Sequence, residues 1–163
     1  MKKGFNLKVK WGIFELGELF HIKKGKSIPQ KNRIKGDIPY IGASSKNNGI
    51  ISFIKNENNS LSKNILGVNR TGCVGECFYH PYSCILSENI YQLKCKRGSK
   101  YIYLYLKTCI LKQKNKYSFG HILNIQRMKS QKIKVPMTKE NEVDYAYMEN
   151  YMKWIEKKVL LKK

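Results

Sequence analysis

Four residues between positions 73 and 84 are of the types that bind zinc. Cys73, Cys77, His80 and Cys84 follow one another at short intervals, and tetrahedral zinc accepts thiolate and imidazole ligands. The paired Cys-x-x-Cys spacing of structural zinc sites is absent, and strand residues of different parity point to opposite faces. A small zinc-binding enzyme is therefore the alternative hypothesis. The five cysteines, an odd number, are expected to be free thiols in a reducing compartment.

Other catalytic groupings are missing from the sequence. A magnesium-dependent nuclease needs clustered carboxylates, whereas the 11 acidic residues are spread along the chain. His80-Pro81-Tyr82 lacks the Asn or Asp that opens the Asn/Asp-Pro-Pro-aromatic motif of adenine methyltransferases. Gly25-Lys26-Ser27 retains only the end of a phosphate-binding P-loop. The sequence therefore predicts a protein that is not an enzyme and needs no cofactor or metal.

Charge is the strongest compositional signal. The chain has 32 Lys and Arg residues against 11 Asp and Glu, a formal net charge of +21, and a pI near 9.8. A field of this sign attracts polyanions, of which nucleic acid is the commonest inside a cell. No apolar run approaches the ~20 residues that cross a bilayer, and no signal segment follows Met1-Lys2-Lys3-Gly4. We expect a cytoplasmic protein that binds nucleic acid and no membrane; the alternatives are duplex DNA and, for a generic basic RNA-binding protein, RNA.

The residues that could contact DNA lie in a basic loop and in three polar turns. Ser, Lys and Asn side chains reach base edges and phosphates, and arginine pairs with guanine through two hydrogen bonds. Arg70 is the sharpest candidate because it lies among the glycines of a tight turn; bracing that turn is its alternative role. The full candidate set is Lys24, Lys26, Ser44, Ser45, Lys46, Asn47, Asn48, Asn69, Arg70, Thr71, Lys116, Tyr117 and Ser118.

Short strands must position these turns. Three glycines at positions 67, 72 and 75 allow the backbone to turn tightly, and Asn48-Gly49 supports another turn upstream. Apolar and β-branched runs predict strands at residues 39–42, 50–54, 65–68, 77–79, 85–86 and 90–93. The result is a system of β-hairpins that presents polar groups at its bends.

Capping residues and apolar spacing predict the helices. Residues 16–20 form a short helix near the start of the domain. Ser99 is a favoured N-cap for a helix over residues 100–114, and Asn124 can cap a further short helix. The aromatic residues of the longer helix are expected to lie in the core.

A domain boundary is predicted at Pro136, which is expected to end a closing strand at residues 132–135. The length suits one recognition domain, residues 1–136, followed by a charged linker and a helix in residues 137–163.

The final helix, from Asp144 to Lys163, carries apolar residues at spacings of 3, 4, 3 and 4, which is the pattern of a coiled coil. We expect it to dock onto a helix of a partner subunit or of a second copy, as a homodimer. Packing of the same face on its own domain is the alternative. The expected docking residues are Tyr145, Met148, Met152, Ile155 and Val159.

The central stretch from Gly67 to Leu93, GVNRTGCVGECFYHPYSCILSENIYQL, resembles the middle of a target recognition domain from the specificity subunit of type I restriction–modification enzymes. WGIFELGELF from Trp11, IPYIGASSKNNGI from Ile38 and YSFGHILNIQRMKSQKIKVP from Tyr117 resemble other parts of that domain, in the same order. The resemblance covers nearly the whole chain.

The resemblance implies an α+β fold: a small β-rich target recognition domain of mixed and antiparallel strands, with flanking helices and a C-terminal coiled-coil-like helix. It also implies a non-catalytic module that recognises a DNA sequence and directs a separate methyltransferase subunit to it. A restriction subunit is a further expected partner. The C-terminal helix would then be the surface that docks onto the methyltransferase subunit.

Overall fold

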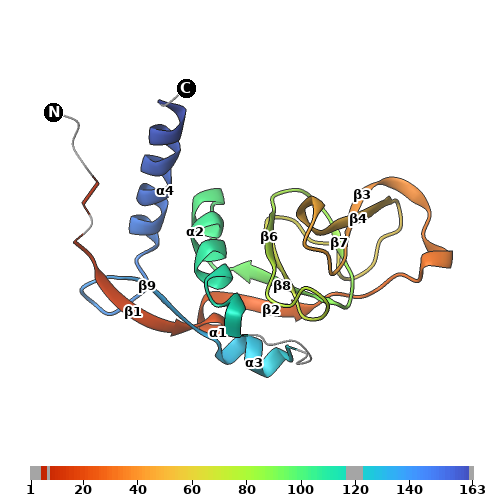
Figure 1. The fold of residues 1–163 in the computed structure, drawn as a ribbon, viewed down its shortest axis with the longest axis horizontal. Coiled ribbons are helices and arrows are strands. Elements are labelled where there is room, and N and C mark those ends of the chain that lie inside the picture. Colours follow the sequence, from red (N-terminus) through yellow and green to blue (C-terminus); the bar gives the residue numbers. More distant parts are fainter. Residues whose placement is uncertain (1–4, 7, 117–122, 162–163) are drawn as a thin grey trace.

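The computed structural model describes residues 5–6, 8–116 and 123–161. Within these residues, most of the strands precede residue 96 and the longer helices follow it (Figure 1). The elements are β1 (Lys10–Glu15), α1 (Leu16–Leu19), β2 (Phe20–Lys24), η1 (Gln30–Asn32), β3 (Lys35–Ile41), η2 (Asn47–Gly49), β4 (Ile50–Ile54), β5 (Ile65–Asn69), β6 (Cys77–His80), β7 (Ile85–Leu86), β8 (Ile90–Cys95), α2 (Lys100–Leu111), η3 (Lys114–Lys116), α3 (Ile125–Ser130), β9 (Lys132–Met137) and α4 (Tyr145–Leu160). Each strand expected from the sequence is present, which confirms the α+β fold.

An antiparallel sheet with the strand order β2-β8-β5-β6 forms the centre of the domain. Leu66 of β5 lies opposite Leu93 of β8 on one side and Tyr79 of β6 on the other. Leu66 and Leu93 are fully buried in a core that also includes Leu106 of α2 and Met128 of α3. The helices therefore fix this sheet, and the sheet in turn supports the turns at the ends of its strands.

A second, smaller sheet has the order β4-β3-β7, in which β3 pairs antiparallel with β4 and parallel with β7. Its core is formed by Tyr40, Ile54 and Ile85, all fully buried. The Tyr40 hydroxyl accepts a hydrogen bond from the backbone N–H of Ile28, at 3.1 Å. Strand β3 begins at Lys35, four residues before the strand expected at residues 39–42.

Strands β1 and β9 form a third, two-stranded ladder that joins the two ends of the domain. Trp11 lies opposite Pro136, and the pairing continues to Met137. The expectation that Pro136 ends the strand is therefore wrong. Proline is tolerated here because β9 is an edge strand.

The expected helix caps are confirmed. The Ser99 side chain accepts a hydrogen bond from the Ile102 N–H at the start of α2, and Asn124 Oδ1 accepts from the Arg127 N–H at the start of α3, at 2.9 Å. Helix α2 ends at Leu111, three residues earlier than expected. Lys114 instead begins the separate turn η3 and forms an ion pair with Glu76.

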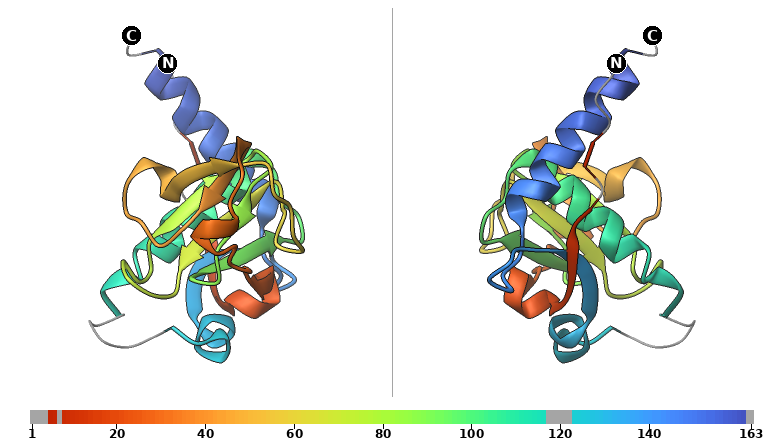
Figure 2. Two further views of the ribbon diagram at one scale, coloured as in Figure 1. Left: turned by 90° about the vertical axis from the view of Figure 1, so that its right-hand side faces the viewer. Right: turned by 90° about the vertical axis from the view of Figure 1, so that its left-hand side faces the viewer.

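Helix α4 runs alongside α2, and its last turns extend beyond the body of the domain (Figures 1 and 2). Residues 137–143 form a tight turn in which the Asp144 N–H donates to the Pro136 carbonyl at 2.9 Å. Met148 is fully buried in the main core, while Val159 is 57% exposed. The first turns of α4 are thus part of the domain's own packing, and the division at residue 136 stays a prediction. Among the described residues, no helix has the length and apolar character to span a membrane.

Candidate nucleic-acid interface

Five segments meet beside the carboxyl ends of β2 and β5, and we call this region the loop end. Backbone hydrogen bonds of 2.9 Å join Gly25 to Ile90 and Arg70 to Asn89. The side chain of Asn69 donates to the Ser44 carbonyl at 3.2 Å. The loop end consists of residues 24–27, 42–49, 69–76, 86–90 and 112–116. Segments that are far apart in the sequence are therefore held as one surface.

Residues 43–49, which we call the 43–49 loop, have an unusual backbone. Asn47, Asn48 and Gly49 have φ angles of 51°, 55° and 76°, in the left-handed region that Asn and Gly tolerate best. The Gly42 N–H donates to the Gly49 carbonyl at 2.9 Å, which closes the base of the loop. Ser45, Lys46 and Asn47 are exposed. These three expected DNA-binding residues therefore form the tip of the loop.

Asn48 and Ser44 are placed differently from their neighbours. Nδ2 of Asn48 donates to the Tyr82 hydroxyl at 2.7 Å and to the Tyr79 carbonyl at 3.2 Å. The Ser44 hydroxyl accepts from the Lys46 N–H at 3.0 Å. Both side chains make hydrogen bonds within the protein. A run of small polar residues in the sequence therefore does not reveal which of them are exposed at the tip and which hold the loop in place.

The second polar turn contains Asn69, Arg70 and Thr71. Asn69 is 1% exposed, and its amide braces the 43–49 loop. Nη1 of Arg70 donates to the Glu88 carbonyl at 3.3 Å, and its guanidinium carbon lies 5.8 Å from the centre of the Tyr91 ring. Nε of Arg70 is buried without a hydrogen-bond partner among the described residues. Arg70 and Thr71 are half-buried, so Arg70 combines a bracing contact with partial exposure at the surface.

Exposed lysines surround these turns. Lys24 and Lys26 are exposed at the end of β2, and Lys112 and Lys116 are exposed after α2, although Lys112 also lines an aromatic cavity beside Trp11. Lys114 is close to them but is paired with Glu76. Lys112 was not in the set expected from the sequence, although it lies in the same basic run as Lys116. Two further expected residues, Tyr117 and Ser118, lie outside the described residues.

The cysteines do not form a metal site among the described residues, where no group of three or more His, Cys, Asp or Glu side chains is gathered. Burial raises the pKa of Cys77 and of Cys84 to about 12, while Cys73 is exposed. Buried thiols with such pKa values remain protonated, whereas zinc binds thiolates. This geometry gives no support to the zinc-enzyme alternative.

His80, at the end of β6, is a buried neutral imidazole. Burial, together with the smaller effect of the positive charge of Lys107, lowers its pKa from 6.5 to about 4. Nδ1 of His80 lies 3.2 Å from the Tyr82 hydroxyl. The sequence offered His80 as a zinc ligand, but the fold uses it as a neighbour of the 43–49 loop.

The free energy of unfolding should fall with acidification because of His80. Its pKa is lower in the folded than in the unfolded chain, so its stabilisation is complete above pH 6.5 and is lost as the pH falls toward 4. Between pH 7 and pH 5 the wild type should lose about 2 kcal/mol more than a His80→Asn variant, which lacks the titrating group. Urea unfolding of both proteins at the two pH values measures the difference. Equal losses would contradict the buried neutral imidazole.

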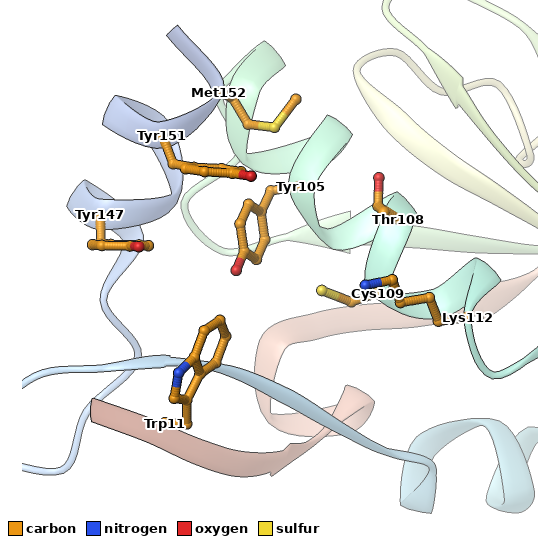
Figure 3. A pocket seen from close by; sticks show the side chains of 8 residues that line it. All are labelled: Trp11, Tyr105, Thr108, Cys109, Lys112, Tyr147, Tyr151 and Met152. Atoms are coloured by element: carbon orange, nitrogen blue, oxygen red, sulfur yellow. The ribbon is translucent and has the colours of Figure 1, made fainter. Parts of the chain in front are cut away.

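A cavity of about 330 Å³ lies between β1, α2 and α4 (Figure 3). Tyr105 of α2 and Tyr151 of α4 face it, with ring centres 6.0 Å apart. Met152, one of the expected docking residues, also lines the cavity. Tyr145 and Met148 pack on the main core, Ile155 is half-buried and Val159 is exposed. The first part of the expected docking seam therefore packs within the domain, and only its last residues are accessible to a partner.

The chain is similar in sequence to known proteins of one family. Residues 8–162 match the family model of the type I restriction modification DNA specificity domain. The chain is 41% identical over 152 residues to the "Type II restriction enzyme BgcI specificity subunit S.BcgI" of Heyndrickxia coagulans, which covers 92% of this chain and 45% of that protein. The chain thus spans less than half the length of this curated relative.

Solved structures share the fold. The S subunit of a type I restriction–modification system from M. genitalium matches with a TM-score of 0.66 and 18% identity, over 91% of this chain and 39% of that one. The HsdS subunit from Thermoanaerobacter tengcongensis matches with a TM-score of 0.66 and 14% identity, over 97% of this chain and 40% of that one.

Proposed function

Because the chain belongs to the family of type I restriction modification DNA specificity domains, we propose that it is a sequence-specific DNA-binding module for a separate methyltransferase subunit. The module carries no catalytic step of its own. It selects the DNA site, and the partner modifies that site. A restriction subunit is a further partner that the same module would direct, and the complex would act in the cytoplasm, where the DNA is.

The observation that carries the proposal is the convergence of the loop end. Loops on a rigid sheet can present side chains in a fixed arrangement, which base recognition requires. Here Asn69 holds the 43–49 loop, and the Arg70 backbone joins the neighbouring turn, so the exposed tip is attached to the central sheet. The lysines around the loop end supply the contacts to phosphates that set the register on the duplex.

We propose that Ser45, Lys46, Asn47, Arg70 and Thr71 read or contact the bases. The remaining expected residues fall into two groups, one that supports the loop and one that contacts phosphates. Ser44, Asn48 and Asn69 support the loop, and Lys24, Lys26 and Lys116 contact phosphates. Tyr117 and Ser118 stay predictions, as residues of the segment that follows Lys116.

Arg70→Ala should lower the affinity for the preferred duplex by roughly 1–3 kcal/mol and leave random duplex nearly unaffected. The reason is that a guanidinium pairs with a guanine edge only in the correct sequence. The preferred site is obtained by selection from a randomised duplex pool with the full 163-residue chain, and affinities are measured by fluorescence anisotropy. A duplex RNA competitor of the same length tests the RNA-binding alternative.

Lys63→Ala is the matched control, because Lys63 is an exposed cation that precedes β5, at the end opposite Arg70. It should not change the preference for the selected site. Equal losses on selected and random DNA, or loss of the folded state in Arg70→Ala, would assign Arg70 to bracing the Glu88 turn.

The second half of the proposal concerns the partner. The exposed apolar end of α4 (Val159, Leu160 and Leu161 are 57%, 63% and 80% exposed) needs a covering surface. We propose that Ile155 and Val159 continue the inward-facing stripe of Met148 beyond the domain and dock onto a helix of the methyltransferase subunit or of a second copy. Lys157 and Lys158 beside this stripe favour an acidic partner helix.

A further inference from the structure

We propose that His80, Tyr82 and Asn48 form a hydrogen-bonded relay that positions the 43–49 loop for DNA recognition. The relay residues would be positioning residues, which act on specificity through Ser45, Lys46 and Asn47 without touching the DNA. This inference rests on the proposed function for its role in recognition. Its claim about the loop can be tested without DNA.

The distances define the direction of the relay. Nδ2 of Asn48 lies 2.7 Å from the Tyr82 hydroxyl, which lies 3.2 Å from Nδ1 of His80, and the same Nδ2 lies at a longer 3.4 Å from that Nδ1. An amide nitrogen only donates, so the Tyr82 oxygen accepts from Asn48 and its own proton points to His80. Nδ1 of His80 must then be the acceptor, and the ring proton is on Nε2. A neutral imidazole is required for this arrangement, and burial favours the neutral form.

The end of the relay at His80 is enclosed by packing. The His80 side chain is fully buried, and its Nε2 lies against the backbone of β5, where a Cβ atom on Gly67 would come within 2.8 Å of it. Glycine at position 67 thus leaves the space that the ring occupies. Nε2 is buried without a hydrogen-bond partner among the described residues. The imidazole is therefore anchored by packing, and a group bound to Nδ1 is held at a fixed place relative to the central sheet.

The other end of the relay is strained backbone. Asn47 and Asn48 are non-glycine residues with positive φ angles, a conformation that costs free energy unless the surroundings hold it. Asn48 has its amide fixed by Tyr82 and by the Tyr79 carbonyl. The hydrogen bond from Asn69 to the Ser44 carbonyl holds the start of the same loop. With both sides of the loop fixed, the exposed tip between them has one direction relative to the sheet.

The test removes a single oxygen atom. Tyr82→Phe removes the shortest hydrogen bond of the relay and leaves only the longer contact between Asn48 and His80. Tyr79→Phe is the matched control. The Tyr79 hydroxyl also makes a 2.7 Å hydrogen bond, to Asn64 Oδ1, but away from the 43–49 loop. Asn48→Gly is a second variant, because glycine keeps the left-handed backbone accessible while removing the amide. All variants are made in the full 163-residue chain.

Amide hydrogen exchange gives the first result, and it needs no DNA. The Gly42 and Gly49 N–H groups, which bond within the loop, should exchange about tenfold faster in Tyr82→Phe and Asn48→Gly. They should be unchanged in Tyr79→Phe, and the amides of β5 should be unchanged in every variant. Unchanged exchange at Gly42 and Gly49 in Tyr82→Phe, or faster exchange throughout β5, would overturn the relay.

Binding to duplexes selected from a randomised pool gives the second result. Tyr82→Phe and Asn48→Gly should lose about tenfold of their preference for the selected over random duplex, with affinity for random duplex unchanged. A preference retained in full would overturn the role in recognition. A wild-type chain that selects no sequence would overturn the proposed function, and the exchange measurement would then decide the positioning of the loop alone.

Discussion

Raising the salt concentration from 50 to 200 mM is expected to weaken the binding of duplex DNA on the order of a thousandfold. The loop end carries exposed lysines that lack a carboxylate partner among the described residues: Lys24, Lys26, Lys46 and Lys116. If these and further basic side chains together neutralise about six phosphates, the logarithm of affinity should fall against the logarithm of salt with a slope near −5. Fluorescence anisotropy with one duplex over a salt series measures this slope.

A charge-removal variant shows whether these side chains are responsible. Replacing Lys24, Lys26 and Lys116 with Ala should reduce the slope by roughly three, because each lost phosphate contact removes about one unit. Lys63→Ala should leave the slope as it is. A wild-type affinity that does not depend on salt would exclude electrostatic binding at this surface, despite the net charge of +21.

The combined substitution of Ile155 and Val159 with Glu is expected to abolish assembly with the partner. Two carboxylates in an apolar helix contact would be buried without partners, at a cost of several kcal/mol. Met152 is not a suitable site for this test, because it lines the aromatic cavity between α2 and α4 and its replacement would disturb the domain itself (Figure 3). Light scattering of the chain alone, and with the methyltransferase subunit, measures assembly.

Ala146→Glu with Asn150→Glu is the matched control for this test. It adds the same two charges to the same helix, at exposed positions about half a turn away from the stripe of Met148. The control should assemble as the wild type does, and both variants should melt at similar temperatures. A wild-type chain that remains a monomer and does not bind the methyltransferase subunit would refute the docking proposal.

Local signals in the sequence predicted much of the fold. Ser99 and Asn124 are short polar residues before apolar spacing, and each caps the expected helix. The glycines at 72 and 75 have positive φ angles, as the tight turn requires. These features depend on neighbours within a few residues, which is why the pattern of residue types reveals them.

Features that depend on residues far apart in the sequence could not be predicted from the sequence alone. Asn48 looked like a base-reading residue because it lies in a polar turn, but its amide bonds to Tyr82, from another strand connection. Lys35 lies in a polar segment and becomes a strand residue because Ile54 pairs with it. Polar residues at a bend can face outward or inward, and only the positions of remote partners decide between the two. Met148 is a similar case among the apolar residues. It was expected to dock onto a partner helix, but it is buried in the core of its own domain.

The ladder between β1 and β9 has a consequence for how the chain folds during synthesis. Lys10 pairs with Met137, and the Leu16 N–H bonds to the Gln131 carbonyl, so β1 stays unpaired until β9 has emerged from the ribosome. At about 5–20 residues per second, that delay is on the order of ten seconds. During this interval Trp11 and Ile13 belong to an unpaired strand edge, which favours association with other nascent chains. The emergence of β9 is therefore the step that ends the exposure of the β1 edge.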